Sequence, residues 1–430
     1  YARRSAILLT AVALTAVAGC TGGSSAGAGA ASRQFTYWSS WQQSEPQASV
    51  LKKAIKSFEK DTGITVDVQW QGRKILTKLV PALHTGNVPD LVDQGYGPIR
   101  SALVDNDQAA NLGSVYQMRI PGESHTVRDV IPVKLDKFTT TKNGMQYLVP
   151  YEVIGSCIWY NGRSLPQVAA HPPKTWHQFT ALLAKRKTAG HNPLALDGDI
   201  SGYAAMWVGT AVVRSLGAGS LQKLATEKNA SGWGTPAARQ AISNIANLVT
   251  KNYFIPGYSS SKWPAIQNEW ASGKADLLFM GSWAPSETGP TATKAFEYRC
   301  FNFPKMGSNY SVPLSPIGFA IPKSAEHAGA AKKFIAYFMN KKRLSGISTV
   351  AKNLTPRTDI PAPKGLTDLQ TSLSQHNTNQ AVSGALSTWP DYLSKIFKPL
   401  SDQLLTGQVT AQQFITKIQQ QQQHYWKAHG

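Results

Sequence analysis

The sequence has few acidic residues, and this shortage contributes as much to its net charge as the number of bases does. It holds 24 Asp and Glu against 44 Lys and Arg, a formal net charge of +20. A nucleic-acid-binding surface would cluster its bases on one element. Here they are scattered, in runs no longer than Lys332-Lys333 or Lys341-Lys342-Arg343. The composition therefore argues against a nucleic-acid partner.

Cysteine is scarce, and the usual metal and nucleotide motifs are missing. The chain has 3 Cys and 9 His, with no H-E-x-x-H and no G-x-x-x-x-G-K-[ST]. These absences argue against a zinc peptidase and an ATPase. Cys157 and Cys300 lie in apolar, strand-like segments, where they form either a disulfide, as exported proteins allow, or two buried thiols. We expect no metal and no cofactor.

Long apolar runs are absent except near the start of the sequence. Arg3-Arg4 precedes an apolar run over residues 6–18, which is shorter than the roughly 20 residues that a membrane-spanning helix needs. With the small residues Ala18-Gly19 before Cys20, residues 1–19 are typical of a secretory signal peptide. The Cys resembles that of a bacterial lipobox, which implies a lipid on Cys20. Residues 20–34, rich in Gly, Ser and Ala, then predict a flexible tether.

Beyond residue 34 the hydrophobic pattern alternates between strand and helix periods. A strand is predicted at 35–38, a helix over 51–58 that ends at Thr62-Gly63, a strand at 64–69 and a further helix over 76–83. Thr175 is expected to cap a helix. Strands that alternate with helices indicate an α/β fold with mostly parallel sheets. We find no internal repeat, which argues against a repetitive adhesin or scaffold.

A series of short motifs follows the tether. In order, these are Tyr37-Trp38-Ser39, Ser57-Phe58-Glu59-Lys60 before Thr62-Gly63-Ile64, Gly86-Asn87-Val88-Pro89-Asp90-Leu91, Val149-Pro150-Tyr151, Trp159-Tyr160-Asn161, Pro173-Lys174-Thr175-Trp176, Gly273-Lys274-Ala275-Asp276 leading to Gly281-Ser282-Trp283, and Ile317-Gly318-Phe319-Ala320-Ile321-Pro322. Their order, together with Cys20, resembles the extracellular solute-binding proteins of sugar ABC importers (family 1), the group that includes maltose-binding protein. One departure is Ala275-Asp276, where the family commonly has two alanines.

The resemblance implies a periplasmic-binding-protein-like fold of two α/β lobes, joined by a hinge and separated by a ligand cleft. From the order of the motifs, lobe 1 should comprise residues 35–153 plus 319–375. Lobe 2 should comprise 157–314 plus 376–430. The chain is expected to cross between the lobes near Val153–Cys157 and again near Leu314–Phe319.

A sugar ligand would require flat aromatic rings for its C–H face and polar groups for its hydroxyls. The chain has 12 Trp and 15 Tyr, most of which should pack in cores. The aromatic candidates stand near predicted strand ends, helix starts or family motifs: Trp38, Trp41, Tyr96, Tyr151, Tyr203, Trp207, Trp283 and Trp389. Trp283 also matches the family's stacking tryptophan. The carboxylate candidates are Asp93, Glu152 and Glu287, with surface ion pairs as the alternative role.

Taken together, the sequence predicts a monomeric carbohydrate-binding lipoprotein on the extracellular face of the bacterial cytoplasmic membrane. It would capture a mono- or oligosaccharide by hinge closure and deliver it to the permease subunits of an ABC importer. Its lipid would be its only contact with the membrane, and it would not be an enzyme. The alternative is a secreted glycoside hydrolase that uses a pair of carboxylates about 5–10 Å apart.

Overall fold

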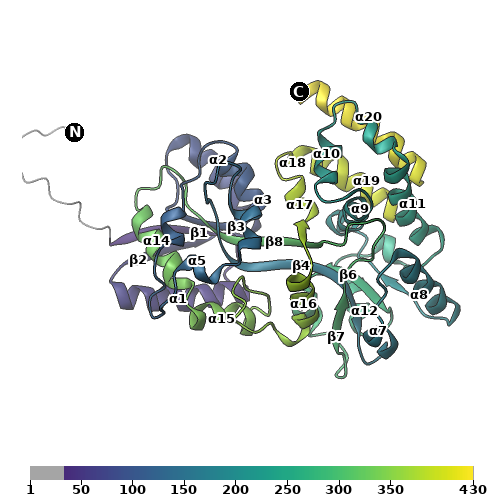
Figure 1. Ribbon diagram of the computed structural model, residues 1–430, viewed down its shortest axis with the longest axis horizontal. Helices are drawn as coiled ribbons and strands as arrows, with labels where there is room; N and C mark the ends of the chain where they lie inside the picture. The colour runs from purple at the N-terminus through teal and green to yellow at the C-terminus, as the bar shows by residue number, and fades with distance from the viewer. Residues whose placement is uncertain (1–32, 430) are drawn as a thin grey trace, which may run out of the picture. The chain divides into compact units, whose positions relative to one another are not determined.

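Nine strands and the helices between them make up residues 33–429, the part of the chain that the computed structural model describes (Figure 1). The strands are β1 (Gln34–Ser39), β2 (Thr65–Trp70), β3 (Leu91–Gly95), β4 (Val149–Asn161), β5 (Leu194–Ala195), β6 (Leu277–Gly281), β7 (Tyr298–Phe301), β8 (Val312–Ala320) and β9 (Thr378–Gln380). Among these residues, no helix combines the length and the apolar character that crossing a membrane requires.

The helices before β4 are α1 (Pro46–Thr62), α2 (Ile75–Thr85), α3 (Tyr96–Ile99), α4 (Gly113–Tyr116), α5 (Val127–Val130) and α6 (Asp136–Thr139). Those between β4 and β8 are α7 (Pro166–Ala170), α8 (Trp176–Thr188), α9 (Ser201–Leu216), α10 (Ser220–Thr226), α11 (Pro236–Thr250), α12 (Ala265–Ala271) and α13 (Ala284–Thr288). The last set is α14 (Ala328–Phe338), α15 (Lys341–Thr349), α16 (Thr367–Gln375), α17 (Val382–Ala385), α18 (Pro390–Tyr392), α19 (Lys398–Leu405) and α20 (Ala411–His429). Short 3₁₀ or π segments lie at 72–74, 100–104, 133–135, 231–234, 258–260, 364–366 and 393–397.

The opening β-α-β unit forms as the hydrophobic pattern predicts. Pro46 occupies the first turn of α1, where its missing N–H costs nothing. The helix ends at Gly63, whose φ of 67° is left-handed and whose N–H donates to the carbonyl of Glu59 (2.9 Å). The chain then enters β2, which pairs with β1 in parallel. The local chemistry of Thr62-Gly63 thus sets the length of α1.

The strands form two connected sheets. Sheet I holds β2-β1-β3-β8, the first half of β4, and β9. Sheet II holds the second half of β4 with β6, β5 and β7. The expectation of mostly parallel sheets is wrong, because β8 is antiparallel to both β3 and β4, and β4 is antiparallel to β6 and β7. β4 carries the chain from sheet I to sheet II, and β8 carries it back beside β4 in the opposite direction. This return accounts for the mixture of parallel and antiparallel pairs.

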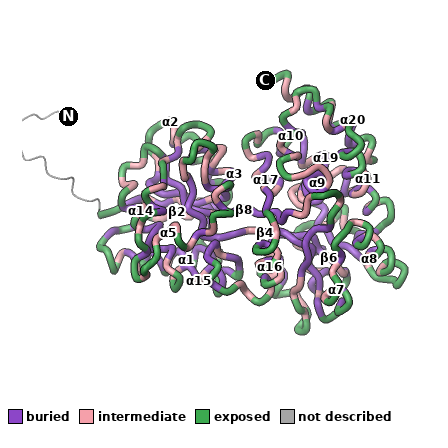
Figure 2. Tube along the Cα trace, viewed as in Figure 1, coloured by how far each residue is buried: buried purple, intermediate pink, exposed green. Residues whose placement is uncertain are grey.

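Strands β4 and β8 lie side by side and connect the two sheets (Figure 1). Their ladder runs from Val149 opposite Phe319 to Gly155 opposite Leu314. At the next residue, Ser156, β4 changes partner and pairs with Gly281 of β6. Figure 2 shows both strands as mostly buried.

Two hydrophobic cores pack against the sheets, and the first extends from sheet I onto sheet II through Trp159, Leu278 and Met280. Around sheet I, the rings of Phe35, Phe58 and Phe334 meet at 5.4–6.3 Å between centroids. In the other core, Trp207 of α9 meets Phe279 of β6 edge-on at 5.0 Å. Such edge-to-face pairs add specificity to the large apolar area that aromatic residues bury. The first core therefore continues across the junction between the two sheets.

Candidate functional site

The carboxyl ends of β1, β2 and β3 lie at one edge of sheet I, because the three strands are parallel neighbours. Trp41 follows β1, Arg73 follows β2, and Gln94 lies near the end of β3. The guanidinium of Arg73 lies 4.6 Å from the centre of the Trp41 ring and donates to the carbonyl of Ser40 (2.7 Å). Edges of this kind are where open α/β sheets place their ligands.

Asp93 on β3 is fully buried beneath this edge and holds it together. Its carboxylate accepts hydrogen bonds from the hydroxyls of Tyr37 (2.6 Å) and Tyr151 (2.8 Å) and from the backbone N–H of Ser40 (2.5 Å). Tyr151 in turn accepts from the indole N–H of Trp41 (2.6 Å). Burial raises the pKa of Asp93, and the hydrogen bonds that it accepts offset this rise only in part. Asp93 therefore fixes Trp41 through Tyr151.

A bulge in β4 brings a second carboxylate to the same edge. The register of β4 on β8 shifts between Pro150 and Glu152, so Tyr151 is the extra residue. Bulges re-aim side chains next to functional sites. Here Tyr151 turns to Asp93, while Glu152 faces a different set of partners.

Glu152 is completely buried, and only one of its oxygens is hydrogen-bonded. Oε1 accepts from the amides of Gln47 (3.2 Å) and Asn353. Asn353 is itself positioned by the hydroxyl of Ser282, which donates to its Oδ1 (2.7 Å). Oε2 has no partner. Burial is the main cause that raises the pKa of Glu152 to about 7.

Sheet II contributes an aromatic wall. β6 ends at Gly281, and Trp283 follows at the start of α13. The Trp283 ring packs directly on Gly281, since a Cβ at that residue would lie 2.0 Å from Cζ3 of the ring. Tyr203 comes from the first turn of α9. Burial, followed by the negative charge of Glu287, raises the pKa of the Tyr203 hydroxyl.

These side chains surround a cavity of about 510 Å³. Of the predicted residues, it is lined by Trp41, Glu152, Tyr203, Trp283 and Glu287. Residues that the sequence analysis did not identify complete the lining: Ser40, Glu45, Pro46, Gln47, Arg73, Gln94, Ile154, Ser286, Ile317, Ala351 and Asn353. The cavity offers aromatic rings beside carboxylates and amides, which suits a small, polar molecule with an apolar face.

Three further candidates, Asp93, Tyr151 and Trp38, do not line the cavity. Asp93 and Tyr151 form the hydrogen-bonded support described above. Trp38 lies within β1, opposite Val92 of β3, and packs against the core of sheet I.

The remaining candidates lie in packed regions. Tyr96 of α3 is buried against Phe138, with ring centroids 5.2 Å apart. Trp207 is fully buried beside Phe279. Trp389 meets Trp426 of α20 edge-on at 6.0 Å.

Two of the lining residues that the sequence analysis did not name could have been predicted from the sequence. Arg73 follows β2 as Trp41 follows β1, and Gln94 lies near the end of β3, so the rule for parallel strand ends points to all three. Asn353 could not have been predicted in this way. It comes from the segment after α15, and its hydrogen bonds to Ser282 and Glu152 hold it at the cavity.

The structure joins Cys157 on β4 to Cys300 on β7 by a disulfide. The predicted lipidation site Cys20, the signal peptide at 1–19 and most of the tether lie outside the described residues. Within residues 33–429, no group of three or more His, Cys, Asp or Glu side chains could hold a metal ion.

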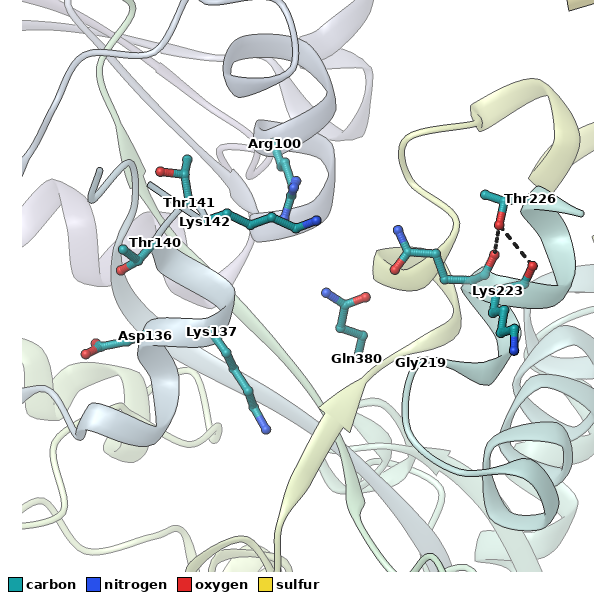
Figure 3. A pocket seen from close by; sticks show the side chains of 11 residues that line it. Arg100, Asp136, Lys137, Thr140, Thr141, Lys142, Gly219, Lys223, Thr226 and Gln380 are labelled. Atoms are coloured by element: carbon teal, nitrogen blue, oxygen red, sulfur yellow. Dashed lines mark hydrogen bonds between the residues drawn. The ribbon is translucent and has the colours of Figure 1, made fainter. Parts of the chain in front are cut away.

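A second cavity, of about 840 Å³, has a different character (Figure 3). Its charged lining is mainly basic, with Arg100, Lys137, Lys142 and Lys223. The one acid in the lining, Asp136, pairs with Arg128 (2.8 Å). This cavity contains none of the predicted site residues and no aromatic residue, so its chemistry differs from that of the first cavity.

Comparison with known proteins identifies the family. A family model described as bacterial extracellular solute-binding protein matches residues 53–371. The chain is 27% identical over 303 residues to a protein of Mesorhizobium japonicum, covering 67% of this chain and 70% of that one. It is 23% identical over 394 residues to one of Rhizobium meliloti, covering 88% and 91%. Both relatives bear the name "probable sugar-binding periplasmic protein".

A solved structure shows the same fold. The bacterial solute receptor AcbH, described as having an exclusive preference for β-D-galactopyranose, superposes with a TM-score of 0.74 at 18% identity. The superposition covers 92% of this chain and 98% of that one. It confirms the predicted two-lobe α/β fold, and the family match over residues 53–371 confirms the resemblance seen in the motifs. The chain belongs to the family of bacterial extracellular solute-binding proteins.

Proposed function

We propose that the chain captures a carbohydrate in the cavity between sheets I and II and delivers it to the permease of an ABC importer. The observation that carries this proposal is the cavity of about 510 Å³, where Trp41, Tyr203 and Trp283 stand beside Glu152 and Glu287. A sugar presents an apolar C–H face to aromatic rings and a rim of hydroxyls to carboxylates and amides. The names of the two relatives support a sugar as the ligand.

The polar groups of the cavity are held in place before any ligand arrives. Gln47, Asn353 and Ser282 fix Glu152, and Asp93 and Tyr151 fix Trp41. A preorganised site loses less conformational freedom when it binds. We infer that Trp41, Glu152, Tyr203, Trp283 and Glu287 contact the sugar, and that Asp93 and Tyr151 position Trp41.

We propose that lobe 1 comprises residues 35–153 plus 319–375 and lobe 2 residues 157–314 plus 376–430, with the ligand enclosed by hinge closure. The change of partner along β4 at Gly155 and Ser156 supports a hinge there. Helix α16 contacts β4 and β7. This end of lobe 1 therefore packs directly against a strand of the second lobe.

The cellular setting is also a proposal. Residues 1–19 would direct export, Cys20 would carry the lipid, and residues 20–34 would tether a monomer to the extracellular face of the membrane. The chain would act on no substrate chemically, and the energy for transport would come from a separate ATPase. Mass spectrometry of the protein from its native host, compared with a Cys20→Ser variant, should show a lipid on the wild type alone.

The test of capture is a thermal-shift panel of mono- and oligosaccharides, followed by calorimetry and product analysis. We expect one sugar to bind each chain and to be recovered intact. Trp283→Ala should weaken its binding by at least about 1 kcal/mol. The matched Trp426→Ala variant removes a tryptophan that does not line the cavity and should bind normally. Cleavage of the sugar, or equal affinity in the folded Trp283→Ala variant, would contradict the proposal.

A further inference from the structure

The cavity proposed to hold the sugar has a charge opposite in sign to that of the chain. The chain carries +20, yet the lining includes three acids, Glu45, Glu152 and Glu287, and a single base, Arg73. Arg73 is already paired with Glu45 through both carboxylate oxygens, at 2.6 Å and 3.1 Å. The lining therefore supplies no other cation for Glu152 and Glu287.

One carboxylate oxygen of Glu152, Oε2, has no hydrogen-bond partner. Its Oε2 is buried with no hydrogen-bond donor, while both amide donors serve Oε1. A buried polar atom without a partner is rare and costly, and so requires an explanation. Burial is the largest cause that raises the pKa of Glu152, and the negative charge of Asp93 adds to it. The hydrogen bonds from Gln47 and Asn353 and the charge of Arg73 lower that pKa without cancelling the rise. A donor brought by the ligand would remove this cost.

Glu287 provides a second acceptor at the rim of the same cavity. Its Oε2 accepts from the amide of Gln267 (3.1 Å), and the Oε1 of Gln267 is itself buried without a partner. Desolvation and the charge of Asp197 raise the pKa of Glu287. The rings of Tyr203 and Trp283 line the cavity together with the two carboxylates. Aromatic faces combined with carboxylates are the groups that recognise an ammonium ion.

We propose that the sugar bound in this cavity is an amino sugar, whose protonated amine is held by Glu152 and Glu287 beside the rings of Trp283 and Tyr203. This inference rests on the proposed function, since it specifies the ligand of the same cavity. A neutral hydroxyl can donate to Oε2 but brings no charge. An ammonium group donates as well and lets both carboxylates stay ionised after water has left. An N-acetyl group is neutral, so an N-acetylated sugar lacks the positive charge of the protonated amine.

The test compares sugars that differ only in the substituent on carbon 2 of each ring. Calorimetry at about pH 7, where the amines are largely protonated, is run on three matched sets. They are glucosamine, glucose and N-acetylglucosamine; galactosamine, galactose and N-acetylgalactosamine; and the β-1,4-linked dimers of glucosamine, glucose and N-acetylglucosamine. In at least one set the amine should bind at least about ten-fold more tightly than both of its partners.

Two variants assign the preference to residues. Glu152→Gln keeps Oε1 for Gln47 and Asn353 and replaces the unpartnered oxygen by an amide, so its fold should survive. It should remove the preference for the amine, and Glu287→Gln should reduce it. The matched control Glu326→Gln changes an exposed acid that does not line the cavity and should keep the full preference.

The outcomes separate this inference from the proposed function. If the amine reaches this preference of about ten-fold in none of the three sets, or if only a neutral sugar of the wider panel binds, the amino-sugar inference is refuted and sugar capture stands. If no sugar binds the folded protein, both are refuted. If the amine binds best but both Gln variants keep the preference, the assignment to Glu152 and Glu287 is refuted.

Discussion

Gly281→Ala tests whether the position of Trp283 sets the affinity of the cavity. A Cβ at residue 281 would lie 2.0 Å, 2.3 Å and 2.4 Å from three atoms of the Trp283 ring. Ordinary van der Waals contact begins at 3.4 Å, so the ring or the strand must move by about 1.4 Å. The backbone of Gly281 has no positive φ, so the methyl group adds no backbone strain of its own. The displaced ring should raise the sugar's Kd about ten-fold, which corresponds to about 1.4 kcal/mol.

The assay is calorimetry with the sugar that the thermal-shift panel selects, together with urea unfolding. We expect overpacking to lower the free energy of unfolding by about 1–3 kcal/mol. Gly329→Ala is the matched control, because nothing lies within 4 Å of its Cβ position. A double-mutant cycle gives the decisive comparison. In a Trp283→Ala background, Gly281→Ala should cause no further loss of affinity, and a full additional loss would refute the role given to the ring.

Three other predictions concern charge, covalent structure and packing. Burial raises the pKa of Glu152 from its ordinary value of 4.5 to about 7, so ionisation destabilises the folded state increasingly between these values and fully above pH 7. Glu152→Gln should therefore gain stability relative to the wild type by about 2–3 kcal/mol between pH 5 and 8 in urea titrations, whereas a constant difference would contradict the buried carboxyl. Replacing both Cys157 and Cys300 by Ala opens a link between residues 143 apart and should lower the free energy of unfolding by about 2–5 kcal/mol; an unchanged urea midpoint would argue against the bond. Trp207→Ala should cost about 3–5 kcal/mol of stability because the residue is fully buried, and a loss below about 1 kcal/mol would contradict this packing.

Local sequence signals predicted the individual elements well. Thr175 caps α8 as expected, and its hydroxyl accepts from the N–H of Gln178 in a capping box. Gly63 ends α1 where the pattern stops. Such features depend on a few neighbouring residues, so they can be read along the chain. The antiparallel course of β4 and β8 could not, because it depends on which distant segments pair.

The site was only partly predictable, for reasons that particular residues show. Tyr203 and Trp207 lie one turn apart on α9, yet only Tyr203, in the first turn, lines the cavity, while Trp207 packs on Phe279. Their spacing gives them the same helix face, so periodicity alone cannot separate them. Asp93 was a candidate ligand carboxylate, but it lies in the middle of β3 and buried tyrosines already use its oxygens. Such differences depend on tertiary packing.

The shared strand β4 also determines how stiff the connection between the two sheets is. From Glu152 to Tyr160 every residue of β4 has a partner, first on β8 and then on β6, with no gap at the change. The N–H of Ser282 closes the junction by donating to the carbonyl of Gly155 (2.8 Å). Bending here must distort a continuous hydrogen-bonded ladder, because no flexible loop lies at the junction. The connection should therefore be stiff and should return elastically to one angle. Its amides should exchange with deuterium as slowly as those of the cores, although the proposed hinge lies here.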